Sequence, residues 1–477
     1  MDSKQLEESA PGLAGTMPPE FDTPLGHHVA RAIGKTLAPP RLGGKLWIGF
    51  LLLVIAAGLA AYIMQLVYGL AMTGMRDYVS WGVYMTNFVF FIGVSHAGTL
   101  ISAILRVTNA EWRRPITRMA EGITVFALLV GAPMVIVDMG RPDRLQHVLW
   151  YGRLNSPILW DVLSVTTYIA GSFVYLYVAS IPDFAILAQQ GSTGNIFSAF
   201  RLRIYRFFSL GYRGTPAQKH HLERALGTMA IVIIPVAVSV HTVVSWVFGM
   251  TLRPGWHSTI FGPYFVIGAI FSGTAGIVLA MAAFRRIYHL ENYLTNRHFR
   301  YLGTLLLVFN ILYIYFTLSE YLTTWYGGEA VDMRLVDMLM GVNHFGPLFW
   351  ATIVFGLFVP AFLLVLPTKK SIAPIVIAAF LVNIGMWVKR YLIIIPTMLT
   401  PFIDPKAADA SPSYIPTVVE WTITAAAFAF FLLLFTLFAK FLPIISIWET
   451  VEGVETLGAG RTGVSEELDA LVGKETP

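Results

Sequence analysis

Ionisable side chains inside long apolar segments are the residues of this chain best suited to chemistry. Such groups are costly to place in lipid, so a function is the first expectation for them. Carboxyl and imidazole groups accept and release protons, which makes proton transfer the chemistry to expect. The residues concerned are His96, Glu121, Asp138, Asp161, His241, Glu320, His344, Lys389 and Arg390.

His96 lies in the sequence SHAGT, near the middle of an apolar segment that we expect to form one helix over residues 80–105. Gly93 and Gly98 leave space beside it. A neutral imidazole in such a space can take a proton from a quinol hydroxyl, so His96 is a candidate quinone-binding and catalytic residue. The alternative is a structural hydrogen bond between two packed helices.

Asp138 ends the next apolar segment in the sequence VDMGRPDR, and Arg141 follows three residues later. A glycine turn at the helix end should bring this carboxylate beside guanidinium groups, where it stays ionised and takes protons. An Asp–Arg clamp that only fixes the loop is the alternative. Asp161 follows the sequence SPILW on the same side of the membrane, although an acidic residue in the first turn of a helix also complements the helix dipole.

A second set of ionisable residues lies farther along the chain. His241 and Glu320 are single polar groups in apolar segments, which suits either a proton path or a structural hydrogen bond. Lys389 and Arg390 end a later apolar run, where they either join that path or extend toward the lipid headgroups.

The elements that must position these residues are membrane-spanning helices. Apolar residues make up 56% of the 477-residue chain and charged residues only 13%, which is about half the share in a soluble domain. The apolar runs are long and continuous, which favours helices over barrel strands. We therefore expect an all-α integral membrane protein with about ten transmembrane helices.

The expected spans can be placed along the sequence. Runs that can cross about 30 Å of hydrocarbon begin near Leu46, Trp81, Met119, Ile158, Leu226, Thr259, Leu302, Phe345, Pro374 and Val418. Lys and Arg concentrate in alternate loops, together with the N-terminal segment and Lys440, so both termini are predicted to be cytoplasmic. The first 45 residues are polar, so we expect no cleaved signal peptide.

An internal repeat relates the second predicted helix to the sixth. Trp81, Gly93 and Gly98 match Trp256, Gly268 and Gly273 at identical spacing, and Pro157 and Trp160 in the fourth helix match Pro347 and Trp350 in the eighth. We interpret this as two parallel-repeat four-helix bundles plus two flanking helices. A chance match is the alternative, because tryptophan and glycine are common in membrane helices.

This interpretation divides the chain into seven parts. They are a polar N-terminal segment (1–45), a first flanking helix (46–75), a first four-helix bundle with the quinol site (80–250), a second four-helix bundle with a possible proton path (256–395), an outer loop (396–417), a last flanking helix (418–448) and a polar cytoplasmic tail (449–477).

The chain contains no cysteine. It therefore cannot hold a disulfide, an iron–sulfur cluster or a covalently attached c-type haem, and any such centre must lie on a partner. The basic residues alternate between loops and form no single stripe, so we expect no nucleic-acid partner.

Four segments together resemble a known family. WGVYMTNFVFFIGVSHAGTLISAILRV, VDMGRPDR, NSPILWD and YFTLSEYLTTWYG are similar to segments of the NrfD family of polysulfide reductase membrane subunits. Within that family the chain is most similar to the ActC-type subunits of bacterial alternative complex III. The resemblance runs from about Trp81 to Arg390, and the DMGRP and SPxLWD segments are specific mainly in combination.

The resemblance implies a subunit of the bacterial inner membrane that oxidises a quinol, menaquinol or ubiquinol, without a metal, haem or cluster of its own. Its implied partners are c-type haem subunits, a periplasmic iron–sulfur protein, a second NrfD-like membrane protein and lipid. Carried onto this chain, His96 and Asp138 accept the protons, and Arg141 and Asp161 shape the quinone pocket. His241, Glu320, Lys389 and Arg390 are the residues of a hypothetical proton path.

Three other interpretations remain open. A secondary transporter also has repeats and charges at mid-membrane, but its helix breaks should match in both halves. A b-type cytochrome needs paired axial ligands, for which His96 and His241 are one possible pair. The third alternative is a purely structural membrane anchor for other subunits.

Overall fold

The computed structural model describes residues 35–194, 199–251, 253–342, 345–366, 371–403 and 413–459, and all regular structure in these ranges is helical. Nine helices there are long and apolar enough to cross a membrane. Helix α4, at 25 residues, is about 37 Å long and has the length as well. The expectation of an all-α membrane protein with about ten long helices is confirmed.

The long helices follow one another with short elements between them. Their bounds are α3 Leu42–Tyr68, α4 Val83–Val107, α5 Arg114–Met139, α7 Pro157–Gly194, α9 Pro216–Gly249, α10 Phe261–Tyr288, α11 Asn296–Gly327, α15 Ala373–Leu399 and α16 Val418–Phe441, with one further span made of α13 Gly346–Ile353, the π-helical turn η6 Val354–Phe358 and α14 Val359–Val365. The short helices are α6 His147–Trp150, α8 Ala199–Phe208, α12 Ala330–Met340 and α17 Ile447–Ala459, with single 3-10 turns η2 Lys35–Leu37, η3 Leu70–Met72, η4 Glu111–Arg113 and η5 Pro142–Arg144.

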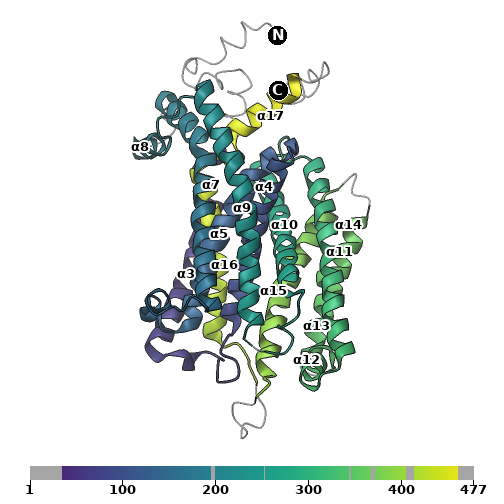
Figure 1. Ribbon diagram of the computed structural model, residues 1–477. Coiled ribbons are helices and arrows are strands. Elements are labelled where there is room, and N and C mark those ends of the chain that lie inside the picture. Colours follow the sequence, from purple (N-terminus) through teal and green to yellow (C-terminus); the bar gives the residue numbers. More distant parts are fainter. Residues whose placement is uncertain are drawn as a thin grey trace.

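The molecule has two ends, which we name the α17 end and the α12 end after the short helices that lie there (Figure 1). Helix α3 begins and α16 finishes at the α17 end, where the Lys440 ammonium donates to the Thr36 carbonyl at 2.9 Å. Asp138, at the finish of α5, and Glu420, at the start of α16, are at the opposite, α12 end.

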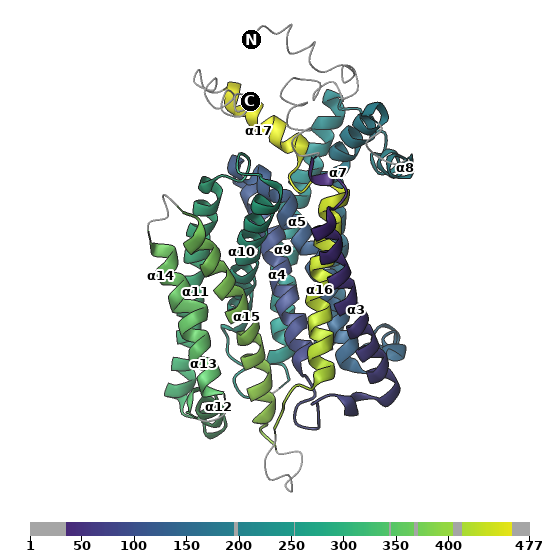
Figure 2. The same cartoon turned by 180° about the vertical axis from the view of Figure 1, so that it is seen from behind.

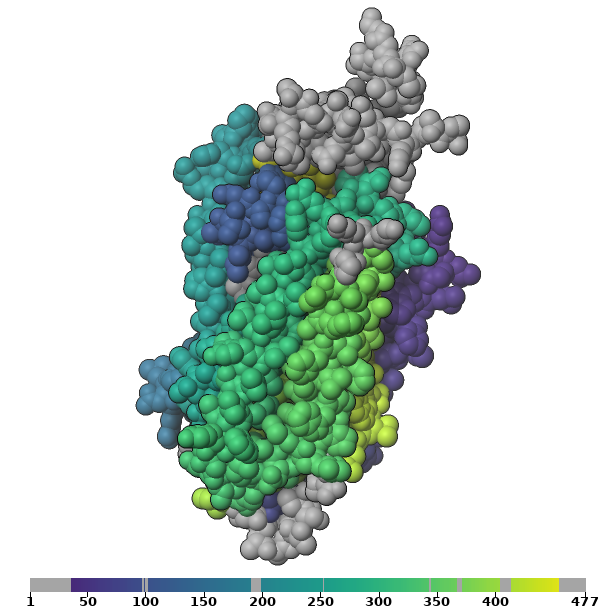
Figure 3. Space-filling view, turned by 90° about the vertical axis from the view of Figure 1, so that its right-hand side faces the viewer, coloured from purple at the N-terminus to yellow at the C-terminus, as the bar shows by residue number. Residues whose placement is uncertain are grey.

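The long helices pack as two groups and a flanking pair (Figure 2). Helices α4, α5, α7 and α9 pack on one another, and so do α10, α11, α13–α14 and α15, while α10 joins the groups by packing along α4. The flanking pair, α3 and α16, packs on the α4–α5 side. Figure 3 shows the outer face of the second group, covered by green helices, with purple α3 at its edge.

Tryptophans of the proposed repeat occupy related positions. The Trp81 and Trp256 rings stack on each other at 6.0 Å, where the two groups meet. The Trp160 and Trp350 indoles both donate to a carbonyl of the segment before their helix, that of Leu154 or Met340. The matched spacings therefore mark similar local structures in both groups.

Several helices extend beyond their apolar runs. Helix α9 begins at Pro216 instead of near Leu226, and α11 at Asn296 instead of near Leu302, because capping boxes at Thr215 and Thr295 satisfy their first backbone N–H groups. The first flanking helix ends at Tyr68, short of the expected residue 75, because Gly69 adopts φ +76°.

The segment expected to be a polar tail begins with a docked helix. Asp183 of α7 accepts from the backbone N–H groups of Ile447 at 3.1 Å and Trp448 at 3.2 Å. A carboxylate at a helix N-terminus satisfies free donors and complements the helix dipole. Asp183 therefore fixes α17 to the first helix group.

The π-helical turn η6 lies where two backbones make a close approach. A Cβ atom on Gly385 of α15 would lie 2.6 Å from Gly356 Cα, so no side chain fits there. The Asn310 amide donates to the Leu357 carbonyl at 3.1 Å. Glycine at both positions allows α15 to pack directly on this irregular turn.

We expect Gly385→Ala to lower the stability of the purified protein by about 1–3 kcal/mol, because the added methyl group forces α15 away from η6. Gly227→Ala in α9 is the matched control, since nothing lies within 4 Å of its Cβ position. Thermal unfolding in detergent measures both variants. Equal melting temperatures would contradict the close approach.

Candidate functional site

A buried histidine pair joins two helices at the centre of the first group. His96 lies in the middle of α4, and its Nε2 is 3.1 Å from Nδ1 of His241 on α9. The ring centroids are 3.9 Å apart, and both side chains are fully buried. Residues 145 positions apart in sequence thus form one contact.

The surroundings of His96 are rich in hydrogen-bond acceptors. Its Nδ1 lies 2.7 Å from the Ile92 carbonyl oxygen and its Nε2 lies 2.6 Å from that of Ala237. A neutral imidazole has one N–H group, so only the doubly protonated ring can donate to both carbonyls. His241 Nε2 has no partner within the part of the chain that the structure describes. The pair is therefore a fully buried contact between two imidazoles, with carbonyl oxygens at both nitrogen atoms of His96.

The contact between His96 and His241 argues against a haem that uses both histidines as axial ligands. Axial ligands point their nitrogen atoms at an iron that lies between them. Here the two rings contact each other directly, with nitrogen atoms 3.1 Å apart. A porphyrin plane does not fit between rings in this arrangement.

A polar face of α7 leads from the histidine pair toward the α12 end. The Tyr168 ring packs on His96 at 4.6 Å, and its hydroxyl donates to the Ser95 carbonyl at 3.2 Å. Asp161 lies seven residues before Tyr168 on the same face of α7. This spacing is about two helical turns, so Asp161 is about 10 Å from Tyr168 along the helix axis, toward the α12 end. Its Oδ1 is buried without a partner among the described residues.

Asp138 lies in a second polar cluster, at the α12 end. It accepts from the backbone N–H of Gly82, and its Oδ1 has no partner in the described ranges. Nearby, the Tyr84 hydroxyl donates to the Gln65 side chain at 2.7 Å, and the Gln65 amide donates to the Val137 carbonyl at 2.9 Å. Asp138 is thus a buried carboxyl group with acceptor capacity left over.

Glu420 borders this cluster, and both of its carboxylate oxygens accept hydrogen bonds. Its Oε1 accepts from the Tyr414 hydroxyl at 2.6 Å, and its Oε2 accepts from the backbone N–H groups of Gly74 at 2.7 Å and Thr417 at 2.8 Å. These bonds tie two loops to the start of α16, so we assign Glu420 a structural role.

The expectation that Asp138 lies beside the Arg141 guanidinium is wrong. Gly140 ends α5 with φ +69°, and the following turn directs Arg141 away from the helix. The Arg141 guanidinium instead pairs with Asp143 at 2.8 Å, and both side chains are more than half exposed. The pair lowers the pKa of the Asp143 carboxyl, so this is an ordinary solvent-exposed ion pair.

His96 and Asp138 lie at different depths. Asp138 contacts Gly82, directly before α4, and His96 is 14 residues farther along that helix, about 20 Å away. Both nitrogen atoms of His96 already face protein atoms. The structure therefore groups His96 with His241 and leaves Asp138 at the α12 end. No contact joins Asp138 to Asp161 among the described residues.

The second helix group contains a buried lysine with aromatic neighbours. Lys389 Nζ donates to the Tyr321 hydroxyl at 2.7 Å and lies over the rings of Tyr321 and Phe349. Glu320 acts on Lys389 electrostatically, and its buried Oε2 has no partner among the described residues. A small cavity of about 30 Å³, enough for a single water molecule, is lined by Glu320 and Tyr264.

The sequence suggested that Lys389 and Arg390 end a helix, but in the structure they lie inside helix α15. Helix α15 continues through the apolar residues 391–399, because these pack inside the protein. Lys389 and Arg390 are both buried, so extension to the lipid headgroups is excluded. Arg390 lies over the Phe265 ring at 4.8 Å, and its two terminal nitrogens have no partner among the described residues.

Arg390 links the second helix group to the histidine pair. Its Nη2 would lie 2.8 Å from a Cβ on Gly268, so this glycine makes room for the guanidinium. Arg390 also acts electrostatically on both His241 and Lys389. Glu320 and Lys389, Lys389 and Arg390, and Arg390 and His241 therefore lie within electrostatic range of each other, and His241 contacts His96.

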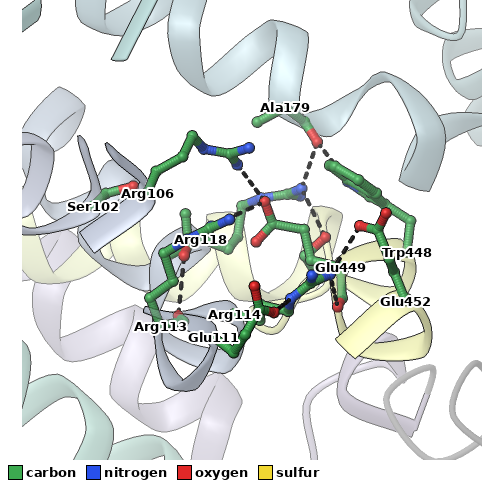
Figure 4. A network of polar contacts seen from close by, with 12 residues as sticks. Ser102, Arg106, Glu111, Arg113, Arg114, Arg118, Ala179, Trp448, Glu449 and Glu452 are labelled. Carbon is green, nitrogen blue, oxygen red and sulfur yellow. Dashed lines mark hydrogen bonds and ion pairs between the residues drawn. The ribbon is translucent and has the colours of Figure 1, made fainter. Parts of the chain in front are cut away.

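A charged network closes the α17 end of the first helix group (Figure 4). Glu449 of α17 pairs with Arg106 and, at 3.5 Å, with Arg113. Burial raises the pKa of the Glu449 carboxyl, but the surrounding guanidinium groups outweigh it, so the pKa lies below its ordinary value. Arg118 pairs with Asp183 at 2.9 Å. Glu121, which accepts from Ser102 at 3.3 Å, lies between this network and the histidine pair.

Asp183, Glu449 and Glu420 were not among the candidate residues named from the sequence. Asp183 and Glu449 stand in segments that read as a span and a tail, and no local signal connects them. The role of Glu420 at a helix start could have been predicted from the sequence, because Thr417 and Glu420 have the spacing of a capping box. Of the ionisable residues named from the sequence, His344 lies outside the described residues.

Comparison with known proteins gives matches along most of the chain. The family model described as Polysulphide reductase, NrfD matches residues 71–402. The chain is 25% identical to a selenate reductase subunit of Mesobacillus selenatarsenatis, over 84% of this chain and 95% of that protein.

Two further relatives are similar over the same share of this chain. The Hdr-like menaquinol oxidoreductase integral membrane subunit of Archaeoglobus fulgidus is 23% identical over 84% of this chain and 94% of that protein. The menaquinone reductase integral membrane subunit of Nitratidesulfovibrio vulgaris is 24% identical over 84% of this chain and 91% of that protein.

We expect Glu449→Gln to release α17 from the first helix group. Removing one partner of a buried ion pair costs about 3–5 kcal/mol. Hydrogen exchange over residues 447–453 should become faster, and the same change should follow acidification, because stability from a lowered carboxyl pKa is lost as the pH falls below about 4. Glu111→Gln, a partly exposed partner of Arg114, is the control. Equal exchange in the two variants would refute this role of Glu449.

Proposed function

Because this chain belongs to the NrfD family of polysulphide reductase membrane subunits, we propose that it is the quinol-binding, quinol-oxidising membrane subunit of an electron-transfer complex of the alternative complex III type. Such a complex serves a respiratory or photosynthetic chain. Electrons pass to an iron–sulfur subunit outside the membrane and from there to c-type haem subunits. The membrane part also includes a second NrfD-like protein.

Two relatives support a quinone substrate. By name, one acts on menaquinol and the other on menaquinone. Menaquinol is therefore the first substrate to test for this chain, with ubiquinol as the alternative. The absence of cysteine requires that any cluster or attached haem that receives the electrons lies on another subunit.

The orientation of the chain follows from its charges. Arginine and lysine are abundant at the α17 end and sparse at the α12 end, which makes the α17 end cytoplasmic. Asp138 and Asp161 then face the periplasmic half of an inner membrane. A quinol bound there is close to an iron–sulfur subunit docked on the α12 end.

The observation that carries this function is a buried carboxyl group with unused acceptor capacity. Oxidation of a quinol releases two electrons and two protons, so the site needs acceptors for both. Asp138 Oδ1 and Asp161 Oδ1 are buried without partners among the described residues, which makes these two carboxyl groups the first proton acceptors. Arg141, exposed and paired with Asp143, belongs to the loop that a partner subunit would cover.

His96 takes a place in the proton path in this proposal. Its nitrogen atoms face two carbonyl groups and His241, so it offers no nitrogen atom to a quinone. The path runs from Glu320 through Lys389, Arg390 and His241 to His96. Near the α12 surface, His257 and Asp332 lie 3.6 Å apart and both act electrostatically on Glu320, which gives the path an exit.

Asp138→Asn should reduce quinol oxidation by the purified complex about 100-fold, because asparagine keeps the shape of the side chain but accepts no proton. Asp143→Asn, in the exposed pair with Arg141, is the matched control and should stay within about twofold of the natural rate. Steady-state oxidation of a soluble menaquinol analogue measures both. A structural anchor or a transporter would lose no quinol activity in the first variant.

Glu320→Gln should lower the number of protons released per electron while quinol oxidation continues. The reason is that a glutamine at this buried position cannot take up a proton from the path. Vesicles that contain the complex, with a pH dye, give the ratio. Glu329→Gln, at the exposed start of α12, is the control. An unchanged ratio in Glu320→Gln would remove the second helix group from the path.

A further inference from the structure

A large cavity is lined by none of the residues assigned above to the quinol site or the proton path. It has a volume of about 1660 Å³ and lies between the flanking pair α3–α16 and helices α10 and α15, with α4 as its floor. Figure 2 shows α15 and α16, two of the helices that line it, on either side of α4. Its middle is lined by apolar side chains, including Phe90, Phe91, Leu279, Phe428 and Phe431.

The size of the cavity requires a long occupant. Pockets for small molecules measure about 300–1,000 Å³. Along α16 the lining extends from Trp421 to Lys440, which is about 28 Å at 1.5 Å per residue and close to the hydrocarbon thickness of a bilayer. A molecule with long flexible chains fits these dimensions.

The α17 end of the cavity is positively charged. Lys440 and Arg41 line it there, and among the described residues no carboxylate lies within ion-pair distance of either. The Lys440 ammonium donates to the Thr36 carbonyl and lies over the Tyr288 ring at 4.8 Å. An ammonium has three N–H groups, so it can also donate to an anion.

Three polar side chains at the opposite end of the cavity bond to one another. The Trp387 indole donates to the Asn87 amide oxygen at 2.9 Å, and the Asn87 amide donates to the Thr424 hydroxyl at 2.9 Å. These polar groups satisfy one another within the protein. The terminal methyl groups of acyl chains would leave these bonds intact.

We propose that this cavity binds an anionic phospholipid. The phosphate contacts Lys440 and Arg41 at the α17 end, and the acyl chains lie against the phenylalanines of α4 and α16. Basic pockets between membrane helices on the cytoplasmic side bind anionic headgroups in this way. Because α3–α16 meets the second helix group mainly across this cavity, the lipid also fills the gap between them.

The test measures phosphatidylglycerol bound to the full complex, purified in mild detergent, delipidated and then titrated with the lipid. Native mass spectrometry gives the bound copies. The double variant Lys440→Gln, Arg41→Gln should bind about tenfold or more weakly, and Lys440→Arg should bind normally. Lys45→Gln is the control, because Lys45 is exposed at the same end but does not line the cavity.

A filling variant keeps the test decisive if the charge variants fold poorly. Ala425 lines the cavity and is exposed, so Ala425→Trp fills space without repacking a core. It should also lose the lipid while the melting temperature of the complex shows that it is folded. Equal binding in all variants would overturn the proposal. So would a quinone or a partner helix found in the cavity of the natural complex. Quinol oxidation does not enter either readout, so this test is independent of the proposed function.

Discussion

Lipid offers no hydrogen bonds, and this single constraint organises the polar interior of the protein. Every buried donor or acceptor must find its partner inside a helix or between helices. The chain gathers its costly groups along a few seams, where α4 meets α5, α7, α9 and α10, and where α11 meets α15. Among the described residues, the groups along these seams that keep a polar atom without a partner include Asp138, Asp161, His241, Glu320 and Arg390.

The two ends of the molecule manage charge in opposite ways. At the α17 end, arginines are neutralised by carboxylates such as Asp183 and Glu449, and α17 covers them. Glu449 at the α17 end and Asp138 at the α12 end each keep one carboxylate oxygen without a partner among the described residues. Only Glu449 is paired with arginines, whereas Asp138 has no ion pair within the described part of the chain. This contrast agrees with chemistry at the α12 surface and anchoring at the α17 surface.

The sequence was sufficient for the features that depend on composition and local pattern. Apolar runs located the long helices, and the tryptophan spacing predicted positions such as Trp81 and Trp256 that proved to be in contact. It could not show which groups meet. The His96–His241 contact depends on how α4 and α9 pack, and the separation of Arg141 from Asp138 depends on the positive φ of Gly140. Helix α17 was missed because its main partners lie on α5 and α7, far away in the sequence.

The capping of α17 by Asp183 has a consequence for how the protein is made. The residues that it joins are 264 positions apart, so α17 leaves the ribosome after all the long helices. Until then Arg118 has Asp183 and the Ala179 carbonyl as partners, whereas Arg106 and Arg113 lack the Glu449 carboxylate. Insertion of the spans can therefore be complete while assembly is not. Arrival of α17 completes this charged network, and a chain cut short before residue 447 would leave Arg106 and Arg113 without Glu449.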